Sequence, residues 1–456
     1  MSASLHIVIL AAGEGTRMQS ALPKVLHPVG GKPMLRHLLD TARQLEPAGI
    51  HVVIGSGAER VREACADFDV HWVVQSERRG TGHAVEQAMP EIPDGARILV
   101  LLGDHPLIPA KLLQELIRES SAPLSLLTMV LDRPRGYGRI ERDRIGRIAG
   151  IVEDRDATPA QWAIKEVNTG IILARAEALR RWLDQLGCEN AKGEYYLTDI
   201  FAMAHSEGLE IHGVVAPHPA DLMGANDQRQ LAALEQRHRE RQADWLMSRG
   251  VCVADPARID VRGEVEPGRD VRIDVNVVLE GQVTLGDGVI IGPGCVLRDC
   301  DLAAGTMVHA YSVLEGVRTT GACAIGPYAR LRPDTELAEG AKIGNFVEVK
   351  NAAFGRDSKA SHLSYIGDAE LGERVNIGAG TITCNYDGAN KHRTVIGDDV
   401  FIGSDTQLVA PVTVEKGATI GAGTTLTRNA PAGELTVSRV RQTTVEGWKR
   451  PKKKDP

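Results

Sequence analysis

Four residues near the start of the chain have the types and spacing that bind an anion. The segment LAAGEGTRMQSALPKVL carries Gly13 and Gly15, then Arg17, and Lys24 seven residues after the arginine. Glycines let backbone N–H groups turn toward an anion, and the two cations add fixed positive charge. A triphosphate needs both features. A tight turn between a strand and a helix, with solvated cations, is the alternative interpretation of the glycine pair.

A second group of chemically capable residues lies far along the chain, around His362. A neutral imidazole beside an amine is a competent general base near neutral pH, whereas a histidine that only makes hydrogen bonds is the alternative. Three neighbours could bind a phosphate: Arg332, Lys350 and Tyr365. Three more could hold a sugar or an amide: Asn376, Asn385 and Tyr386.

The elements that must position the first group alternate between strand and helix. Helices are expected to open at Pro33 and Pro109, because proline suits the first helical turn. Short apolar runs rich in Val, Ile and Leu predict buried strands over residues 6–12, 51–55, 71–75, 98–104 and 124–131. This alternation predicts an α/β, Rossmann-like domain with a mostly parallel sheet covered on both faces. The glycine segment follows the first strand, and such sheets bind ligands at the carboxyl ends of their strands.

The second half of the chain repeats every six residues. Aliphatic residues recur at this interval in the series 285, 291, 297; 302, 308, 314; 325 to 349; and 396 to 426, commonly followed by glycine. This period predicts a hexapeptide parallel β-helix, here left-handed, of roughly ten coils. The repeat loses register between Val349 and Leu371 and between Ile377 and Ile396. Those two interruptions contain His362 and most of its polar neighbours, which favours a functional role for them.

Between the halves, residues 227–249 are dense in charge and free of glycine, which predicts a connecting helix about 35 Å long. The predicted domains are therefore 1–228, a linker helix over 229–250, the β-helix over 251–437 and a basic tail over 438–456. The tail ends in WKRPKKK. A solvated tail is the preferred interpretation, and a contact with the phosphates of a coenzyme is the alternative.

Composition restricts the class of protein. The seven cysteines are scattered and form no CxxC pair, which indicates reduced thiols in a cytoplasmic protein. No apolar run reaches the length of a membrane span, and no secretory signal is apparent. The net charge of −7 argues against a general nucleic-acid binder, so neither nucleic acid nor membrane is an expected partner.

The glycine segment resembles the signature of the sugar-1-phosphate nucleotidyltransferases, LAAGxGTRM followed by PKxL. The resemblance implies that a sugar 1-phosphate attacks the α-phosphorus of a nucleoside triphosphate, with Arg17 and Lys24 as catalytic cations. It implies Mg²⁺ held by Asp104 and Asn226, although an aspartate after a strand can also be only a helix cap. The implied nucleotide-site residues are Leu10, Ala11, Ala12, Gly13, Lys24, Gln75, Gly80, Thr81, Leu102, Gly103, Asp104, Gly138, Glu153, Asn168 and Asn226.

The segments HLSYIGD and NIGAGTITCNYDG resemble a bacterial family of bifunctional enzymes, N-acetylglucosamine-1-phosphate uridylyltransferase joined to glucosamine-1-phosphate acetyltransferase. The resemblance covers the whole chain. It implies that His362 deprotonates the amine of glucosamine 1-phosphate for attack on acetyl-CoA, and that UTP then reacts with N-acetylglucosamine 1-phosphate. It also implies a homotrimer and a product used for peptidoglycan and lipopolysaccharide synthesis. The implied sugar-phosphate residues are Arg332, Lys350, Tyr365 and Asn376, and the implied acetyl-CoA residues are Ala379, Asn385, Tyr386, Ser404, Ala422 and Arg439.

Three alternatives remain open at this point. The chain could be a single-activity sugar-1-phosphate nucleotidyltransferase with a regulatory β-helix, which would not need HLSY or NYDG. It could be a β-helix zinc enzyme of the carbonic-anhydrase type, with His309, His362 and His392 as its available ligands. It could also be a non-enzymatic scaffold, which would leave both polar groups unexplained.

Overall fold

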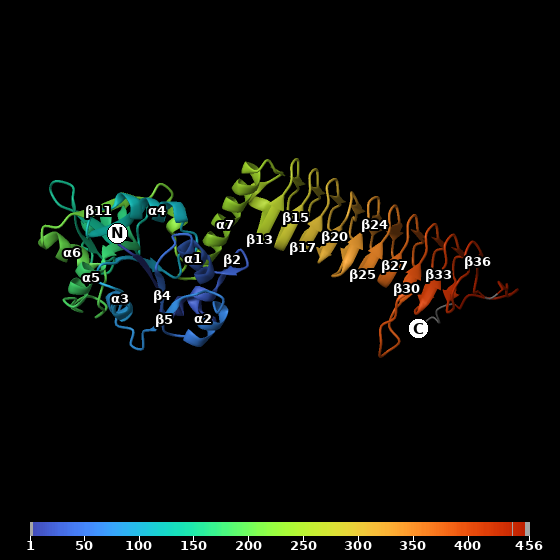
Figure 1. Cartoon of the computed structure of the whole chain (residues 1–456), viewed down its shortest axis with the longest axis horizontal. Coiled ribbons are helices and arrows are strands. Elements are labelled where there is room, and N and C mark those ends of the chain that lie inside the picture. Colours follow the sequence, from blue (N-terminus) through green and yellow to red (C-terminus); the bar gives the residue numbers. More distant parts are fainter. Residues whose placement is uncertain (1–2, 440, 452–456) are drawn as a thin grey trace. The chain divides into compact units, whose positions relative to one another are not determined.

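The structure is a computed structural model that describes residues 3–439 and 441–451. The chain divides into two compact units, Met1–His238 and Arg239–Pro456 (Figure 1). The division falls inside the predicted linker, and the domain boundaries drawn from the sequence remain predictions. None of the helices in the described residues combines the length and apolar content needed to cross a membrane.

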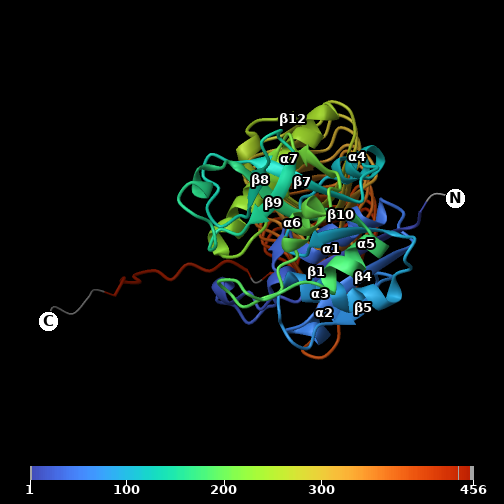
Figure 2. The same cartoon turned by 90° about the vertical axis from the view of Figure 1, so that its left-hand side faces the viewer.

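A mostly parallel sheet forms the centre of the first unit (Figure 2). Its strand order is β11-β7-β10-β6-β1-β4-β5, and all five predicted strands are present in it. The strands are β1 (Leu5–Ala11), β4 (Gly49–Ile54), β5 (His71–Val74), β6 (Arg97–Leu102), β7 (Leu124–Val130), β10 (Glu166–Arg175) and β11 (Ile211–Val215), with β8 (Arg139–Arg142) and β9 (Ile148–Val152) attached through β10. Strand β10, which the sequence analysis missed, is antiparallel to β6 and β7. Its first five residues, EVNTG, lack the continuous apolar run of the five predicted strands.

Helices cover both faces of this sheet, as the alternation predicts. Along β1, Ile7 and Ile9 join one buried cluster and Val8 joins the other, because successive side chains of a strand point to opposite faces. The helices are α1 (Met34–Arg43), α2 (Ala58–Ala64), α3 (Thr81–Ala88), α4 (Ala110–Glu119), α5 (Ala176–Leu183) and α6 (Asp199–Ser206). Pro33 and Pro109 sit at the N-cap positions of α1 and α4, one residue before the first helical turn in which they were expected.

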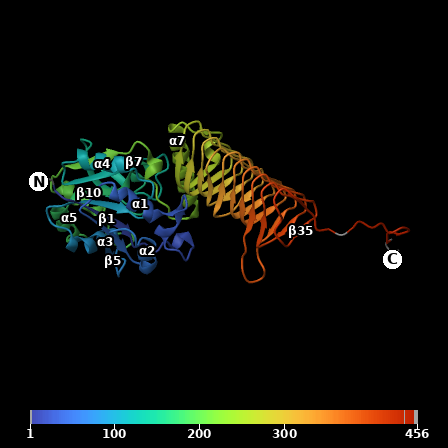
Figure 3. The ribbon, with the colours of Figure 1, turned by 45° about the vertical axis from the view of Figure 1, so that its right-hand side comes forward.

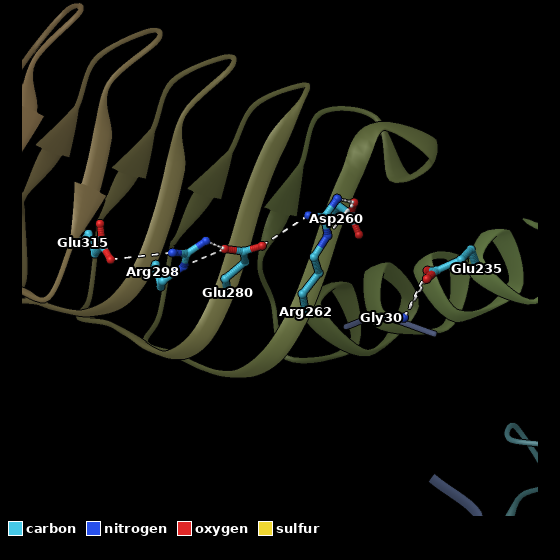
Figure 4. A network of polar contacts seen from close by, with 7 residues as sticks. All are labelled: Gly30, Glu235, Asp260, Arg262, Glu280, Arg298 and Glu315. Atoms are coloured by element: carbon cyan, nitrogen blue, oxygen red, sulfur yellow. Dashed lines mark hydrogen bonds and ion pairs between the residues drawn. The ribbon is translucent and has the colours of Figure 1, made fainter. Parts of the chain in front are cut away.

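The predicted connecting helix is α7 (Gln228–Ser248). In the first unit, its Leu234 is buried against Val29 and Met34. The backbone N–H of Gly30, in the turn between β2 (Pro28–Val29) and β3 (Lys32–Pro33), donates to both carboxylate oxygens of Glu235, at 3.0 and 3.1 Å (Figure 4). In the second unit, Leu246 belongs to the core of the β-helix.

The second unit is a parallel β-helix, whose stacked coils are visible in Figure 3. One ladder consists of β12 (Cys252–Val253), β14 (Arg272–Ile273), β16 (Ile290–Ile291), β18 (Met307–Val308), β21 (Ala324–Ile325), β24 (Lys342–Asn345), β26 (Lys359–His362), β28 (Asn376–Ile377), β31 (Phe401–Ile402), β34 (Thr419–Ile420) and β36 (Leu435–Thr436). The other two faces share β13 (Ile259–Pro267), β15 (Val277–Leu285), β17 (Val296–Leu302), β19 (Val313–Glu315), β20 (Val317–Thr319), β22 (Arg330–Leu331), β23 (Thr335–Leu337), β25 (Glu348–Phe354), β27 (Tyr365–Leu371), β29 (Ile382–Cys384), β30 (Thr394–Ile396), β32 (Gln407–Val409), β33 (Val412–Val414) and β35 (Thr425–Leu426).

The six-residue repeat predicts the core of this unit correctly, since its aliphatic residues are buried from Leu285 to Leu426. The two interruptions have different structural forms. Around the first, the coils shorten, so that Ile343 pairs with Ala360 and Ala360 with Ile377. At the second, Ile377 pairs with Ile402, and the extra residues between β29 and β30 form a loop that projects from the stack (Figures 1 and 3).

A row of alternating charges crosses the first coils (Figure 4). The guanidinium of Arg262 contacts Asp260 at 2.7 Å and Glu280 at 3.2 Å, and Glu280 also accepts from Arg298. The row ends where Arg298 approaches Glu315 at 3.6 Å. Solvent screens these exposed pairs, so each stabilises little by itself, but the row favours correct stacking of successive coils because opposite charges face each other in register.

At one corner of the β-helix, bulky residues rather than glycine make the turns on four successive coils. Tyr311, Tyr328, Phe346 and Leu363 all have positive φ, at 59, 55, 56 and 45°. The rings of the first three stack at centroid separations of 5.2 and 5.4 Å. We call these four residues the corner ridge. About half or more of the surface of each side chain is exposed, at 53, 49, 57 and 62%. Cross-coil stacking offsets the cost of the left-handed backbone.

Candidate active sites

The glycine segment holds its lysine by a close backbone approach. Gly15 has a φ of 64°, and a Cβ added to it would lie 2.6 Å from Cβ of Lys24. Lys24 begins the short helix η2 (Lys24–Leu26), and Arg17 lies in η1 (Thr16–Met18). Gly13 differs from this, since no atom lies within 4 Å of its Cβ position and its φ is not positive. The open side of Gly13 is where an anion could approach the backbone.

Four predicted residues converge at the carboxyl ends of β1 and β6. The ammonium of Lys24 forms an ion pair with Oδ2 of Asp104 and donates to Oδ1 of Asn226 at 2.8 Å. The guanidinium of Arg17 donates to the same amide oxygen at 2.9 Å. These residues lie up to 209 positions apart in the sequence, and the fold brings them together at the carboxyl ends of the strands, where open sheets bind ligands.

The carboxylate of Asp104 stays ionised in a buried position. Burial opposes ionisation, but the nearby charges of His105 and Lys24 outweigh it, so the pKa of Asp104 is lowered from its usual value. For His105, burial lowers the pKa of the imidazole despite the attraction of Asp104. The site therefore keeps a negative carboxylate beside the ammonium of Lys24.

This donor set fits a hard divalent cation. A carboxylate and an amide oxygen are ligands that Mg²⁺ accepts, with phosphate and water oxygens completing its coordination. The ammonium of Lys24 stands between Oδ2 of Asp104 and Oδ1 of Asn226, which indicates that this point attracts positive charge. Asp104 and Asn226 are therefore able to hold such an ion, with Lys24 available to bind phosphate.

Other predicted nucleotide-site residues line the same edge of the sheet. Leu10 and Leu102 are register partners on β1 and β6, and the N–H of Gly103 donates to the carbonyl of Leu10 at 2.9 Å. The buried side chain of Gln75 donates to the carbonyl of Gly80 at 3.2 Å. Gly80 is the N-cap of α3, and the hydroxyl of its first residue, Thr81, accepts from the N–H of Leu197 at 3.1 Å.

A further group forms around β10. The N–H of Asn168 donates to the carbonyl of Gly138 at 2.9 Å, and Glu153 accepts from the hydroxyl of Thr198 at 3.1 Å. Burial raises the pKa of Glu153. A Cβ on Gly138 would lie 3.5 Å from Oε1 of Glu153 and 3.7 Å from Cβ of Asn168, so these three predicted residues are neighbours.

In the second unit, His362 ends β26 with an exposed side chain. Its Nδ1 lies 2.8 Å from Oδ1 of Asn345, its register partner on the preceding coil. An amide oxygen only accepts, so Nδ1 carries the proton and Nε2 is left with a lone pair. This is the tautomer that a general base requires. The sequence analysis missed Asn345, although its position 17 residues before His362, one coil of the repeat, was a usable signal.

The predicted phosphate-binding residues lie on the adjoining face. Arg332 is paired with Glu348 at 3.0 Å, which limits its freedom to turn. Lys350 lies beside Lys391, a residue that the sequence analysis did not select. The hydrogen bond and repulsion from Lys350 lower the pKa of Lys391. Two cations that repel each other in this way form a position that an anion would stabilise.

A partly buried polar network supports this face. The amide of Asn385 donates to Oδ2 of Asp368 and, at 3.4 Å, to the hydroxyl of Tyr365. Asn351 donates to the other oxygen of Asp368 at 2.5 Å. Asp368, also absent from the prediction, thus fixes two amides at once. Asp368 lies among apolar and small residues in IGDAEL, so the sequence suggests only a strand there and gives no sign of a functional residue.

The remaining predicted residues follow a corner of the β-helix. His362, Ala379, Ser404 and Ala422 each directly precede a residue with positive φ, at 363, 380, 405 and 423. The N–H of residue 405 donates to the carbonyl of Ala379, the N–H of residue 423 to that of Ser404, and the side chain of Arg439 to that of Ala422. They therefore occupy equivalent positions on successive coils, about 4.8 Å apart.

Asn376 and Tyr386 lie on the strand next to His362 and on the projecting loop, respectively. Asn376 opens β28, the strand next to that of His362. Tyr386 lies on the projecting loop with 61% of its surface exposed, and its hydroxyl donates to the carbonyl of Gly388 at 2.6 Å. The basic tail lies outside the described residues from position 452 onward.

The zinc-enzyme alternative has no support in this unit. Nδ1 of His362 is bound to Asn345, and Nε2 of His392 lies 2.7 Å from Asp387 within its own loop. Among residues 3–439 and 441–451, no group of candidate metal ligands includes His309, His362 or His392.

Comparison with known families agrees with both halves. Residues 7–246 match the MobA-like NTP transferase domain. Residues 268–299 and 393–428 match the bacterial transferase hexapeptide (six repeats).

Full-length relatives are also similar to this chain. A protein of Alkalilimnicola ehrlichii is 56% identical over 99% of this chain and 97% of its own length. One of Xylella fastidiosa strain M12 is 56% identical over 100% and 99%, and one of Marinobacter nauticus is 55% identical over 98% and 99%. Each of the three is called "Bifunctional protein GlmU".

Proposed function

Because the chain belongs to the family of bifunctional GlmU proteins, we propose that it makes UDP-N-acetylglucosamine in two consecutive reactions. The second unit, a left-handed parallel β-helix, transfers acetyl from acetyl-CoA to glucosamine 1-phosphate. The first unit transfers uridylyl from UTP to the resulting N-acetylglucosamine 1-phosphate and releases pyrophosphate. The product feeds peptidoglycan and lipopolysaccharide synthesis, and the enzyme is cytoplasmic. The observation that supports this most strongly is the 56% identity over nearly the whole chain.

In the acetyl transfer, Nε2 of His362 takes a proton from the sugar amine as its nitrogen attacks the thioester carbonyl. The N–C bond forms and the C–S bond breaks, and the CoA sulfur leaves as a thiolate that becomes a thiol by taking the proton back from the imidazolium of His362. Asn345 holds the imidazole in the required tautomer. Arg332, Lys350 and Tyr365 bind the sugar and its phosphate, with Asn376 beside them. Acetyl-CoA lies along Ala379, Asn385, Tyr386, Ser404, Ala422 and Arg439.

In the uridylyl transfer, a phosphate oxygen of the sugar attacks the α-phosphorus, and the bond to pyrophosphate breaks. The attacking oxygen is already anionic, so no general base is needed. Arg17 and Lys24 bind and orient the triphosphate beside Gly13 and neutralise its charge. Asp104 and Asn226 hold Mg²⁺, which when bound supplies further neutralisation of the phosphates.

The corner ridge supports a homotrimer. Four exposed apolar side chains on successive coils form a surface that a second copy of the chain would cover. Phe346 and Leu363 directly follow Asn345 and His362, so a neighbouring subunit on the ridge would also border the acetyl-transfer site. Light scattering after size exclusion should give three chains, and Phe346→Arg should reduce this number.

Two variants test whether each unit carries its own activity. Lys24→Ala should abolish pyrophosphate release from UTP and N-acetylglucosamine 1-phosphate while thiol release from acetyl-CoA continues. His362→Ala should do the opposite. Loss of both activities in either variant would contradict two independent sites, and absence of thiol release in the wild type would favour the single-activity alternative. Comparing UTP with other triphosphates tests the choice of nucleotide.

A further inference from the structure

A cluster of histidines lies at the amino-terminal edge of the first unit's sheet. His6 is the second residue of β1, His51 the third of β4, and His71 the first of β5. The opening glycine segment follows the other end of β1, which is about 20 Å away for a seven-residue strand. The cluster therefore lies apart from the nucleotide site and has no part in the proposed reaction.

The rings are arranged in a stack. His6 and His51 lie 5.4 Å apart between centroids, and His51 and His71 lie 4.9 Å apart. Glu91, at the end of η3 (Met89–Glu91), places Oε2 at 3.4 Å from Nδ1 of His51 and at 3.4 Å from Nδ1 of His71. Each of the three residues offers one ligand atom that lies within 4.8 Å of those of the other two.

The innermost ring has an unused nitrogen directed at the carboxylate. His51 is only 1% exposed, and its Nδ1 makes no hydrogen bond in the described structure. Its other nitrogen, Nε2, lies 3.1 Å from Nδ1 of His6. When Nε2–H donates to His6, Nδ1 of His51 presents a lone pair toward the negatively charged oxygen of Glu91. Two such acceptors facing each other repel unless a cation lies between them.

The spacing suits a tetrahedral transition-metal ion. Two ligands bound to zinc at its usual distances of about 2.0–2.1 Å are about 3.3 Å apart, which is close to both separations at Glu91. Two imidazoles and a carboxylate favour zinc and its neighbours over Mg²⁺, which prefers oxygen ligands. Glu91 and His71 are about half exposed or more, so an ion can enter from solvent.

The surroundings prepare the buried ligand. The hydrogen bond to His6 fixes the ring as outer partners of metal ligands commonly do. We infer that His51, His71 and Glu91 form a binding site for Zn²⁺ or a similar divalent transition-metal ion, joining η3 to strands β4 and β5.

The opposite tautomers would make the same atoms a metal-free relay of hydrogen bonds from His6 through His51 to Glu91. Titration of the full-length protein with Zn²⁺, at saturating Mg²⁺, separates the two arrangements. We expect the wild type to bind one Zn²⁺ per chain. His71→Ala and Glu91→Gln should each lower the affinity for this ion by more than about tenfold. Both positions are exposed, so neither variant should impair folding. His218→Ala, an exposed histidine outside the cluster, is the matched control and should bind as the wild type does.

Co²⁺ in place of Zn²⁺ gives a spectroscopic measurement that does not depend on activity. The wild type and His218→Ala should show the intense visible absorption of a four-coordinate ion, and the other two variants should not. Saturation with Zn²⁺ should also raise the Tm of the wild type by about 5 °C or more relative to His71→Ala. Zinc binding that is unchanged in His71→Ala and Glu91→Gln, or no binding by the wild type, would overturn the inference.

Discussion

Replacing Gly15 by alanine tests whether the glycine segment positions Lys24 through a close contact. The substitution adds one methyl group at a φ of 64°, where a non-glycine residue costs about 1–2 kcal/mol. The methyl would also lie 2.6 Å from Cβ of Lys24. Backbone or side chain must therefore move by a substantial fraction of an ångström, and the movement acts on the residue that contacts Asp104 and Asn226.

The expected result has two parts. A displacement of this size in a charged group of an active site costs on the order of 100-fold in rate, so kcat/KM for UTP should fall by about that factor. The acetyl transfer should be unchanged, because its residues lie in the other unit. Each kcal/mol of lost stability lowers the Tm of a domain of this size by roughly 2–4 °C. The Tm of the first unit should fall by more than that, because the clash adds to the backbone cost.

Gly146→Ala is the matched control. Gly146 also has a positive φ, at 85°, but no atom lies within 4 Å of its Cβ position. This variant carries the backbone cost without the clash, so it should lose a few degrees of Tm and no activity. Steady-state pyrophosphate release and calorimetry on the three proteins suffice. Full uridylyl transfer by Gly15→Ala, or an equal loss in Gly146→Ala, would refute the reasoning.

Two other predictions concern histidines. Asn345→Ala should lower kcat of acetyl transfer at least tenfold with little change in KM, because the ring of His362 loses its orienting acceptor; normal turnover in a thiol-release assay would contradict that role. His37 donates from Nε2 to the carbonyl of Val29 at 2.7 Å, and burial lowers its pKa from 6.5 to about 4. The unfolded chain therefore binds the proton of His37 more tightly than the folded chain does. The contribution of neutral His37 to the free energy of unfolding is complete above pH 6.5. It is lost as the pH falls toward 4, by up to about 3 kcal/mol. Urea unfolding of His37→Gln should show a correspondingly flatter pH dependence, and parallel curves for the two proteins would disprove the assignment.

Local pattern was enough to predict much of the fold. The apolar runs predicted five strands of the first sheet, because a strand buried on both faces needs apolar side chains at every position. The six-residue repeat predicted the β-helix core for a similar reason, since each coil faces the interior at fixed intervals. Strand β10 was missed because its neighbours in the sheet, rather than its own sequence, stabilise an antiparallel strand with polar residues such as Asn168.

For the two sites as well, some features were predictable from local sequence and others depend on the tertiary structure. Residue types and short motifs predicted an anion-binding loop and a histidine suited to base catalysis, because those chemistries depend on local glycines, cations and an imidazole. Only the tertiary structure decided which partners hold them. Asn226 meets Arg17 across 209 positions, and Asn345 fixes the tautomer of His362 from the preceding coil. The histidine cluster at His51 had no local signal at all, because its three ligands come from separate elements that only the folded sheet brings together.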